Sequence, residues 1–202
     1  LTKQNPVEFV NINGLNTIEV ITKERLTQQT VSLILEKGYH GTGISEILRA
    51  SQVTKGSLYH HFPKGKDQLV TEALKSSTIK LSLQYKQLLK SADSLEDGLK
   101  KLINHAIQEL ELSEYKIGSI LINVSQELGS INKHLQTTCK QLFELIINNL
   151  ESFFLEYDIE KWEESARSFF TSFQGAIVLS KAYQETSFLT QLRTSILPEK
   201  YL

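Results

Sequence analysis

Residues 54–62, with the sequence TKGSLYHHF, carry side chains suited to reading nucleic acid. Hydroxyl, ammonium, phenol and imidazole groups hydrogen-bond base edges and phosphates, and a glycine lets the backbone approach a groove closely. Leu58 and Phe62, four residues apart, would face inward and pack this segment as a helix on its neighbours. We expect Lys55 and Tyr59 to confer specificity. The residues expected on the nucleic-acid side are Thr54, Lys55, Gly56, Ser57, Tyr59 and His60.

Thr42 and Lys66 flank this segment at the expected starts of the neighbouring helices. Free backbone N–H groups and the helix dipole favour a phosphate at such positions, so we expect Thr42, His60 and Lys66 mainly to grip phosphates. The pair His60 and His61 could instead bind a metal, but adjacent histidines on a helix point about 100° apart. We therefore expect no metal site, with His61 packing or contacting a phosphate.

No arrangement of side chains for catalysis is recognisable in the sequence. Ser/His/Asp sets, paired acids and phosphate loops do not occur at usable spacing, and GYHG at residues 38–41 is too short for a nucleotide loop. The single cysteine, Cys139, excludes a disulfide framework and a cysteine-rich zinc module. We therefore predict that the protein is not an enzyme and needs no cofactor.

Three short helices are predicted to position the candidate binding residues. Ser45 or Thr42 can cap the second helix and Thr54 the third, and the turn Ser51–Val53 joins these two helices. Such an arrangement within a few tens of residues is typical of a helix-turn-helix. Apolar residues at helical spacing place the helices at about residues 23–38, 44–50 and 56–62.

Longer helices follow from Lys66 onward. Residues 92–94 interrupt the first of them, and Ser94 with Asp97 resembles a capping box. The predicted helices cover about residues 66–91, 95–110, 114–128, 130–157 and 160–186, with a short helix to 197. No strand-like alternation of useful length occurs, so the predicted fold class is all-α: an N-terminal three-helix unit on a larger C-terminal helical bundle. The predicted divisions are an arm at 1–22, the helix-turn-helix domain at 23–66 and the bundle at 67–202.

Charge is distributed unevenly between these divisions. The chain has 202 residues, 40% of them hydrophobic, and a net charge of -1, which excludes a uniformly basic nucleic-acid binder. Residues 23–66 hold seven basic and three acidic residues, a net +4, so only this part is expected to meet a polyanion. No membrane span or signal peptide is recognisable, and we expect a soluble protein of the cytoplasm.

The segment from Gly38 to Leu69, GYHGTGISEILRASQVTKGSLYHHFPKGKDQL, resembles the DNA-binding domain of the TetR family of transcriptional repressors. Two positions depart from the family pattern: Ser51-Gln52 stands where the turn usually has a small pair ending in glycine, and Thr30 stands where alanine is usual. In the body, the segments 117–129 and 173–182 are similar to the LmrA/YxaF-like branch. The resemblance implies a homodimer on a palindromic operator of double-stranded DNA, released by a small molecule.

The resemblance also implies that the bundle, 67–202, binds the ligand and dimerises. In the family, the last two helices pair with their symmetry mates. Small and apolar residues spaced three or four apart on these helices are the expected dimer interface: Ala166, Phe169, Phe173, Ala176, Ile177, Ser180, Phe188 and Leu192.

An effector pocket is predicted from polar residues within an apolar helix, which must face water, find partners or line a cavity. Asn123, Glu127 and Ile120 share a face, and the next two helices offer residues at compatible spacing. The expected lining is Ile120, Asn123, Glu127, Phe143, Ile147, Phe170 and Gln174. It suits a flat, moderately hydrophobic compound such as an aromatic drug or a plant metabolite, whose binding should shift the helix 66–91. Alternatively, the polar residues are solvated and the phenylalanines are core.

The leading hypothesis is therefore a ligand-responsive, sequence-specific DNA-binding repressor. One alternative is a helical ligand-binding protein or enzyme with a vestigial DNA-binding head, which should have lost the polar tips and the positive charge that residues 54–62 retain. Another alternative is a regulator without an effector, whose body only dimerises.

Overall fold

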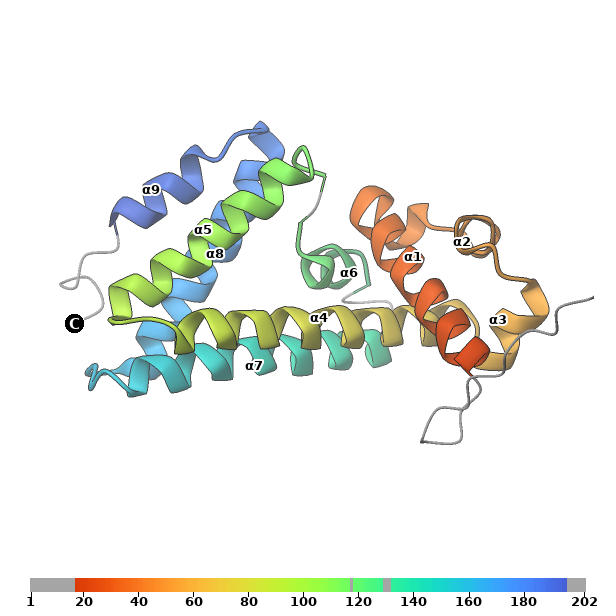
Figure 1. The fold of residues 1–202 in the computed structure, drawn as a ribbon, viewed down its shortest axis with the longest axis horizontal. Coiled ribbons are helices and arrows are strands. Elements are labelled where there is room, and N and C mark those ends of the chain that lie inside the picture. Colours follow the sequence, from red (N-terminus) through yellow and green to blue (C-terminus); the bar gives the residue numbers. More distant parts are fainter. Residues whose placement is uncertain (1–16, 117, 129–131, 196–202) are drawn as a thin grey trace, which may run out of the picture.

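The computed structural model describes residues 17–116, 118–128 and 132–195. Within these ranges it contains α-helices and no β-strand. The three helices α1–α3, called the head below, lie at one end, and α4–α9 form the body (Figure 1). The all-α prediction is confirmed. The helices are α1 (Thr17–Gly41), α2 (Ile44–Ser51), α3 (Lys55–His61), α4 (Lys66–Lys90), α5 (Leu95–Leu112), α6 (Ile120–Leu128), α7 (Lys133–Leu155), α8 (Trp162–Tyr183) and α9 (Ser187–Ser195).

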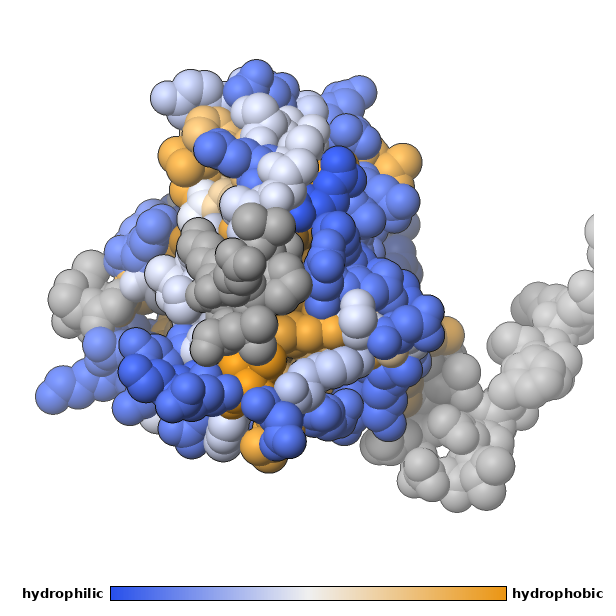
Figure 2. All heavy atoms as spheres, turned by 90° about the vertical axis from the view of Figure 1, so that its left-hand side faces the viewer, coloured by the Kyte–Doolittle hydropathy of each residue, from blue (hydrophilic) through white to orange (hydrophobic). Residues whose placement is uncertain are grey.

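The helix α4 runs from the head to the far end of the body, with α7 alongside it (Figure 1). Its 25 residues extend about 37 Å. Helix α6 packs between α1 and α7, and α8 packs on α7, α5 and α9. The end of the body farthest from the head is mostly hydrophilic, with scattered apolar patches (Figure 2). No helix in the described ranges is both long and apolar enough to cross a membrane.

Two buried cores meet along α1 and α4. Leu33 and Leu69 belong to the head core, whereas the next residues, Ile34 and Val70, belong to the body core. Consecutive residues on a helix point about 100° apart, so one helix can serve two cores. The head core consists of Leu26, Leu33, Ile47, Leu58, Phe62 and Leu69.

Side-chain caps set the ends of some helices but not of others. Thr54 caps α3 as predicted, because its side chain accepts a hydrogen bond from the N–H of Ser57 at 3.2 Å. The residue before α2 is Gly43, which has no side chain to cap with. The prediction that Ser45 or Thr42 caps α2 is therefore wrong.

The first helix begins earlier than predicted. It starts at Thr17 rather than Lys23, so residues 17–22 are not part of an arm, and residues 1–16 lie outside the described residues. Glu19 stands in its first turn, where the helix dipole favours a negative charge. Glu19 was therefore a signal of the helix start that could be read from the sequence, although the segment around it has little apolar periodicity.

The sixth helix begins later than predicted, at Ile120 rather than Glu114. Glu114 and Tyr115 have left-handed backbone conformations, with φ of 51° and 59°, which an α-helix cannot contain. The N–H of Tyr115 donates to the carbonyl of Leu110, so this turn closes the end of α5. Apolar periodicity did not reveal this turn, because no proline marks it and the apolar stretch that follows reads as a continuation of the helix predicted from Glu114.

Candidate nucleic-acid interface and ligand pocket

Helix α3 points its polar side chains outward and its apolar ones inward. Leu58 and Phe62 are fully buried in the head core, as predicted. Tyr59 is 40% exposed despite its size, which leaves its phenol available to a partner. Of the remaining predicted residues on this segment, Ser57 is half-buried and the exposed ones are Thr54, Lys55, Gly56 and His60.

Lys55 is an uncompensated cation at the start of α3. Among the described residues, none forms an ion pair with Lys55, whereas Lys37 pairs with Glu46 of α2. The His60 ring lies 3.9 Å from a carboxylate oxygen of Glu19. A cation without an internal partner is free to displace a counterion from a phosphate. The surface around α3 can therefore bind an anion.

Thr42 is not placed to grip a phosphate with its side chain. It is fully buried, and its hydroxyl donates to the carbonyl of Gly38 at 2.7 Å. The sequence suggested a helix start with free N–H groups, but α2 begins two residues later. Thr42 therefore stabilises the end of α1.

Lys66 is half-buried at the junction of head and body. Its ammonium donates to the backbone carbonyl of Tyr39 at 2.6 Å and lies 3.8 Å from the centre of the Tyr39 aromatic ring. Burial lowers the pKa of the Lys66 ammonium, while the carboxylates of Asp67 and Glu127 act in the opposite direction. Lys66 was predicted to grip a phosphate, but in the structure its ammonium joins α4 to α1.

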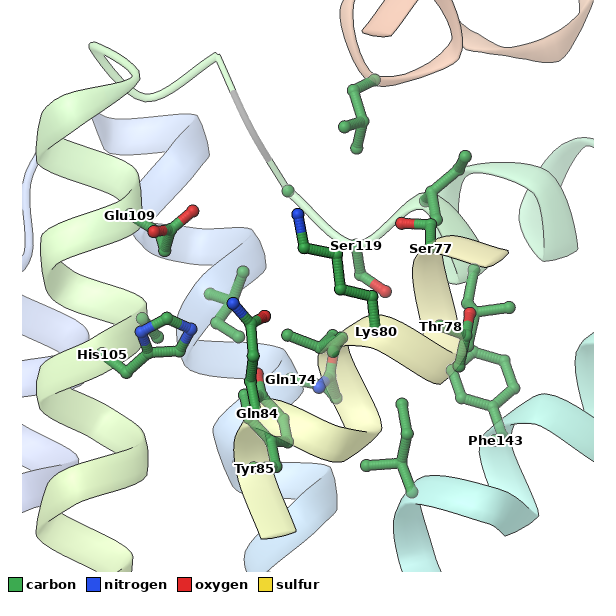
Figure 3. A pocket seen from close by; sticks show the side chains of 18 of the residues that line it. Ser77, Thr78, Lys80, Gln84, Tyr85, His105, Glu109, Ser119, Phe143 and Gln174 are labelled. Carbon is green, nitrogen blue, oxygen red and sulfur yellow. The ribbon is translucent and has the colours of Figure 1, made fainter. Parts of the chain in front are cut away.

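A cavity of about 340 Å³ lies between the body helices α4, α5, α6, α7 and α8, and Leu35 of α1 also lines it. Its inner wall is mostly apolar, and Phe143 and Phe170 meet edge to face with ring centres 6.3 Å apart. Figure 3 shows Gln174 deep in this pocket, and its Oε1 atom is buried without a hydrogen-bond partner in the part of the chain described. An amide in an apolar wall is the feature that orients a small ligand.

The structure brings four of the seven predicted pocket residues together: Ile120, Phe143, Phe170 and Gln174. The other three do not line the cavity. Ile147 is buried in the body core, the Asn123 amide donates to the carbonyl of Ile34 at 3.4 Å, and Glu127 accepts two hydrogen bonds from α1. The polar face of α6 exists as predicted, but it meets the head rather than the cavity.

Sequence reasoning missed the contribution of α4 and α5 to the pocket. Tyr85 and Thr78 lie on one face of α4, and His105 and Glu109 stand four residues apart on α5 (Figure 3). Lys80 and Gln84 are exposed beside them. The helical spacing of these polar residues within apolar stripes was the available signal.

The eight residues predicted for the dimer interface face the interior of the chain itself. Seven are buried, and Phe188 packs against the body core. The reason is that the most apolar face of a helix is used first for its own core. A different face of α8 is exposed, uncharged and spaced three or four residues apart: Thr171, Gly175, Val178, Leu179 and Ala182.

Comparisons with known proteins match both parts of the chain. Residues 26–73 match the family described as bacterial regulatory proteins, tetR family, and residues 96–195 match the transcriptional regulator LmrA/YxaF-like C-terminal domain. The HTH-type transcriptional regulator YxaF of Bacillus subtilis is 29% identical over 60% of this chain. The match covers 64% of YxaF, so the chain spans less than two thirds of that relative.

Two further comparisons cover most of the chain. The HTH-type transcriptional repressor DhaR of a Mycobacterium species is 25% identical over 86% of this chain and 89% of its own. The crystal structure of a regulatory protein TetR from Rhodobacter sphaeroides superposes with a TM-score of 0.79 at 20% identity, over 87% of this chain and 96% of that one. The structural likeness concerns the fold alone.

Proposed function

Because the chain belongs to the TetR family of bacterial transcriptional regulators, we propose that it is a cytoplasmic repressor that binds a palindromic operator as a homodimer. A small hydrophobic molecule entering the body pocket releases the operator. The family consists of regulators rather than enzymes, and the repressor role is supported by relatives that are named repressors.

The observation that carries the proposal is the outward face of α3. The polar ends of its side chains project from a helix that the fully buried Leu58 and Phe62 anchor. Lys55 forms no ion pair with any of the described residues. A vestigial head would have no reason to keep a rigid helix with an exposed phenol and an uncompensated cation. This favours the DNA-binding function over the alternative of an enzyme or carrier with a vestigial head.

Within this interface, we assign Lys55 and Tyr59 to base edges and His60 to a phosphate. A bidentate base contact contributes about 1–3 kcal/mol of discrimination. A phosphate contact changes affinity for all sequences alike and the salt slope by about one ion. Thr42 is omitted because its side chain is buried.

The proposed dimer uses the exposed face of α8. A Cβ atom added at Gly175 would meet nothing within 4 Å in one subunit, which leaves room for a second helix to approach closely. Val178 and Leu179 would supply apolar area beside it. A two-fold axis there would set the two copies of α3 about 34 Å apart, the length of one DNA turn.

The dimer is tested by light scattering of the wild type and of Gly175→Arg. We expect a mass near twice 23.0 kDa for the wild type and a shift toward the monomer for the variant. The control is Gln87→Arg, at an exposed position of α4 outside the proposed interface. A wild-type mass near 23.0 kDa at micromolar concentration would contradict the dimer.

The DNA-binding function is tested by selecting bound sequences from a random double-stranded pool and measuring their affinity. The selected sites should be palindromic. Lys55→Ala and Tyr59→Ala should each weaken operator binding by about tenfold or more. Lys90→Ala, at the other end of α4, is the matched control and should bind as the wild type does. Failure to select any sequence, or wild-type affinity in both α3 variants, would refute the assignment.

A further inference from the structure

The last turns of α1 are held by side chains of the body. We call the five body residues that bond this segment the α1 socket, and they come from three helices: α4, α6 and α8. Their partners are mostly backbone groups of residues 34–40, so the socket holds the position of the segment rather than a particular side chain. The α1 socket consists of Lys66, Asp67, Asn123, Glu127 and Lys181.

Glu127 makes the central contact of the α1 socket. Its two carboxylate oxygens accept the backbone N–H groups of Tyr39 at 2.9 Å and His40 at 2.8 Å. These N–H groups are free to do so because Gly38, with φ 75° and ψ 178°, interrupts the helix. A Cβ atom at Gly38 would stand 2.2 Å from the Glu127 Oε1 atom, so only glycine permits this approach.

The other members of the α1 socket surround the same segment. The hydroxyl of Tyr39 donates to Asp67 at 2.5 Å, and Asp67 also accepts from the amide of Asn132, the cap of α7, at 2.9 Å. Lys66 bonds the carbonyl of Tyr39. The head is therefore joined to the body by charge-assisted hydrogen bonds, which are directional and about twice as strong as neutral ones.

The same structural elements also form the wall of the pocket. Leu35 of α1 lines the cavity, and its carbonyl accepts the ammonium of Lys181 from α8 at 3.2 Å. Helix α6 lines the cavity with Ile120 and Leu121 at its first turn. Glu127 stands about 10 Å farther along that helix. One short rigid helix thus touches the pocket at one end and the head at the other.

From this geometry we propose that Glu127 is the positioning residue through which occupancy of the pocket changes the orientation of the head. The inference rests on the proposed function and specifies its regulation. A molecule that fills the cavity presses on the first turn of α6, and the two bonds from Glu127 carry the displacement to α1 and thus to α3. Glu127 itself does not line the cavity, so its removal uncouples the two sites without changing the pocket.

A double-mutant cycle tests this coupling without a known ligand. Ala106 lines the cavity and is buried, so Ala106→Phe fills it from within. We expect Ala106→Phe to weaken operator binding by about tenfold, within the usual range of allosteric coupling. In the Glu127→Ala background the same filling should cost less than about threefold. Gln126→Ala, at the exposed neighbouring position of α6, is the matched control and should leave the tenfold effect intact.

Equal effects of filling in both backgrounds would overturn the proposal, and so would filling that leaves operator affinity unchanged in the wild-type background. Ile177→Phe, at another residue of the cavity wall, replaces Ala106→Phe should the latter fail to fold. Failure of the wild type to bind any DNA would refute the proposed function instead.

Amide hydrogen exchange tests the coupling independently of DNA. The N–H groups of Tyr39 and His40 should be protected in the wild type and stay protected in the filled variants, because the two bonds persist while they carry the displacement, and they should exchange faster in Glu127→Ala. Loss of protection at these two amides in the filled variants, or unchanged exchange in Glu127→Ala, would refute the role of Glu127.

Discussion

The head and the body solve the problem of burial in different ways. The head core contains six buried residues, and three of them, Leu26, Leu33 and Leu69, lie on helices that also serve the body. The body core draws on every helix from α4 to α9. A core this small cannot support a domain by itself. The two short helices of the head, α2 and α3, are therefore held on two long ones, α1 and α4, and the candidate DNA-binding helix α3 is only as rigid as that attachment.

The most severe test of this difference is truncation of a large buried side chain in each core. Phe62→Ala should remove about 3–5 kcal/mol from the head, which is comparable to the whole stability of a small domain. We expect operator binding to be lost while circular dichroism still reports a helical body.

The matched variant in the body is Phe173→Ala, which removes a ring stacked on Phe169 at 5.6 Å. It should lower the main melting temperature and leave operator affinity unchanged below it. A single transition, lowered equally by both variants, would show that the two cores unfold as one unit.

A smaller effect is expected at the junction between the two regions. Gly38→Ala places a side chain in a backbone conformation that only glycine readily adopts, at a cost of about 1–3 kcal/mol, and forces Glu127 away. Urea unfolding should show this loss. Gly43→Ala, whose Cβ would meet nothing within 4 Å, is the control and should change stability by less than about 1 kcal/mol. Equal losses in the two variants would contradict the close approach at Gly38.

Two glutamines with left-handed backbone conformation, one in the head and one in the body, offer substitutions that should stabilise the two regions separately. Gln52 in the turn of the head and Gln184 at the end of α8 have φ of 55° and 58°. Replacing each by glycine should stabilise its own region by about 0.5–1 kcal/mol. Each replacement also removes one exposed hydrogen bond, from Arg25 to Gln52 at 3.2 Å or from Gln184 to the carbonyl of Lys181 at 2.8 Å, so the two gains should be similar. Hydrogen exchange of head and body amides would resolve the two gains, and a uniform gain would contradict separate regions.

The smallest effect concerns pH. Burial, reinforced by the hydrogen bond to Asp67, raises the pKa of the Tyr39 phenol well above its ordinary value. The folded state therefore keeps this proton longer than the unfolded state does, and stability present below about pH 10 is lost above it.

The variant Tyr39→Phe should flatten this alkaline loss of stability in part. Tyr85, whose pKa burial also raises, still contributes in the body. Urea titrations at pH 8 and pH 11 measure the slope, and an unchanged slope would refute the contribution of Tyr39.

The sequence was most informative where one side of a short helix must be polar and the other apolar. In α3 the alternation of Leu58 and Phe62 with polar neighbours allows one orientation only, and the structure has it. The helix caps Thr54 and Ser94 could also be predicted from the sequence, because each side chain accepts a hydrogen bond from the N–H group three residues later. Local sequence thus determined the helices, their order and the outward face of the head.

Only the tertiary structure decided what each face of the long helices meets. On α8, apolar residues suit a subunit's own core and a partner subunit equally well, and Phe169 and Phe173 belong to the core. On α6, Glu127 could have faced water, a ligand or another helix, and the backbone conformation at Gly38 determines that it binds α1. Periodicity specifies that residues share a face, whereas the neighbour of that face depends on long-range packing that no local pattern encodes.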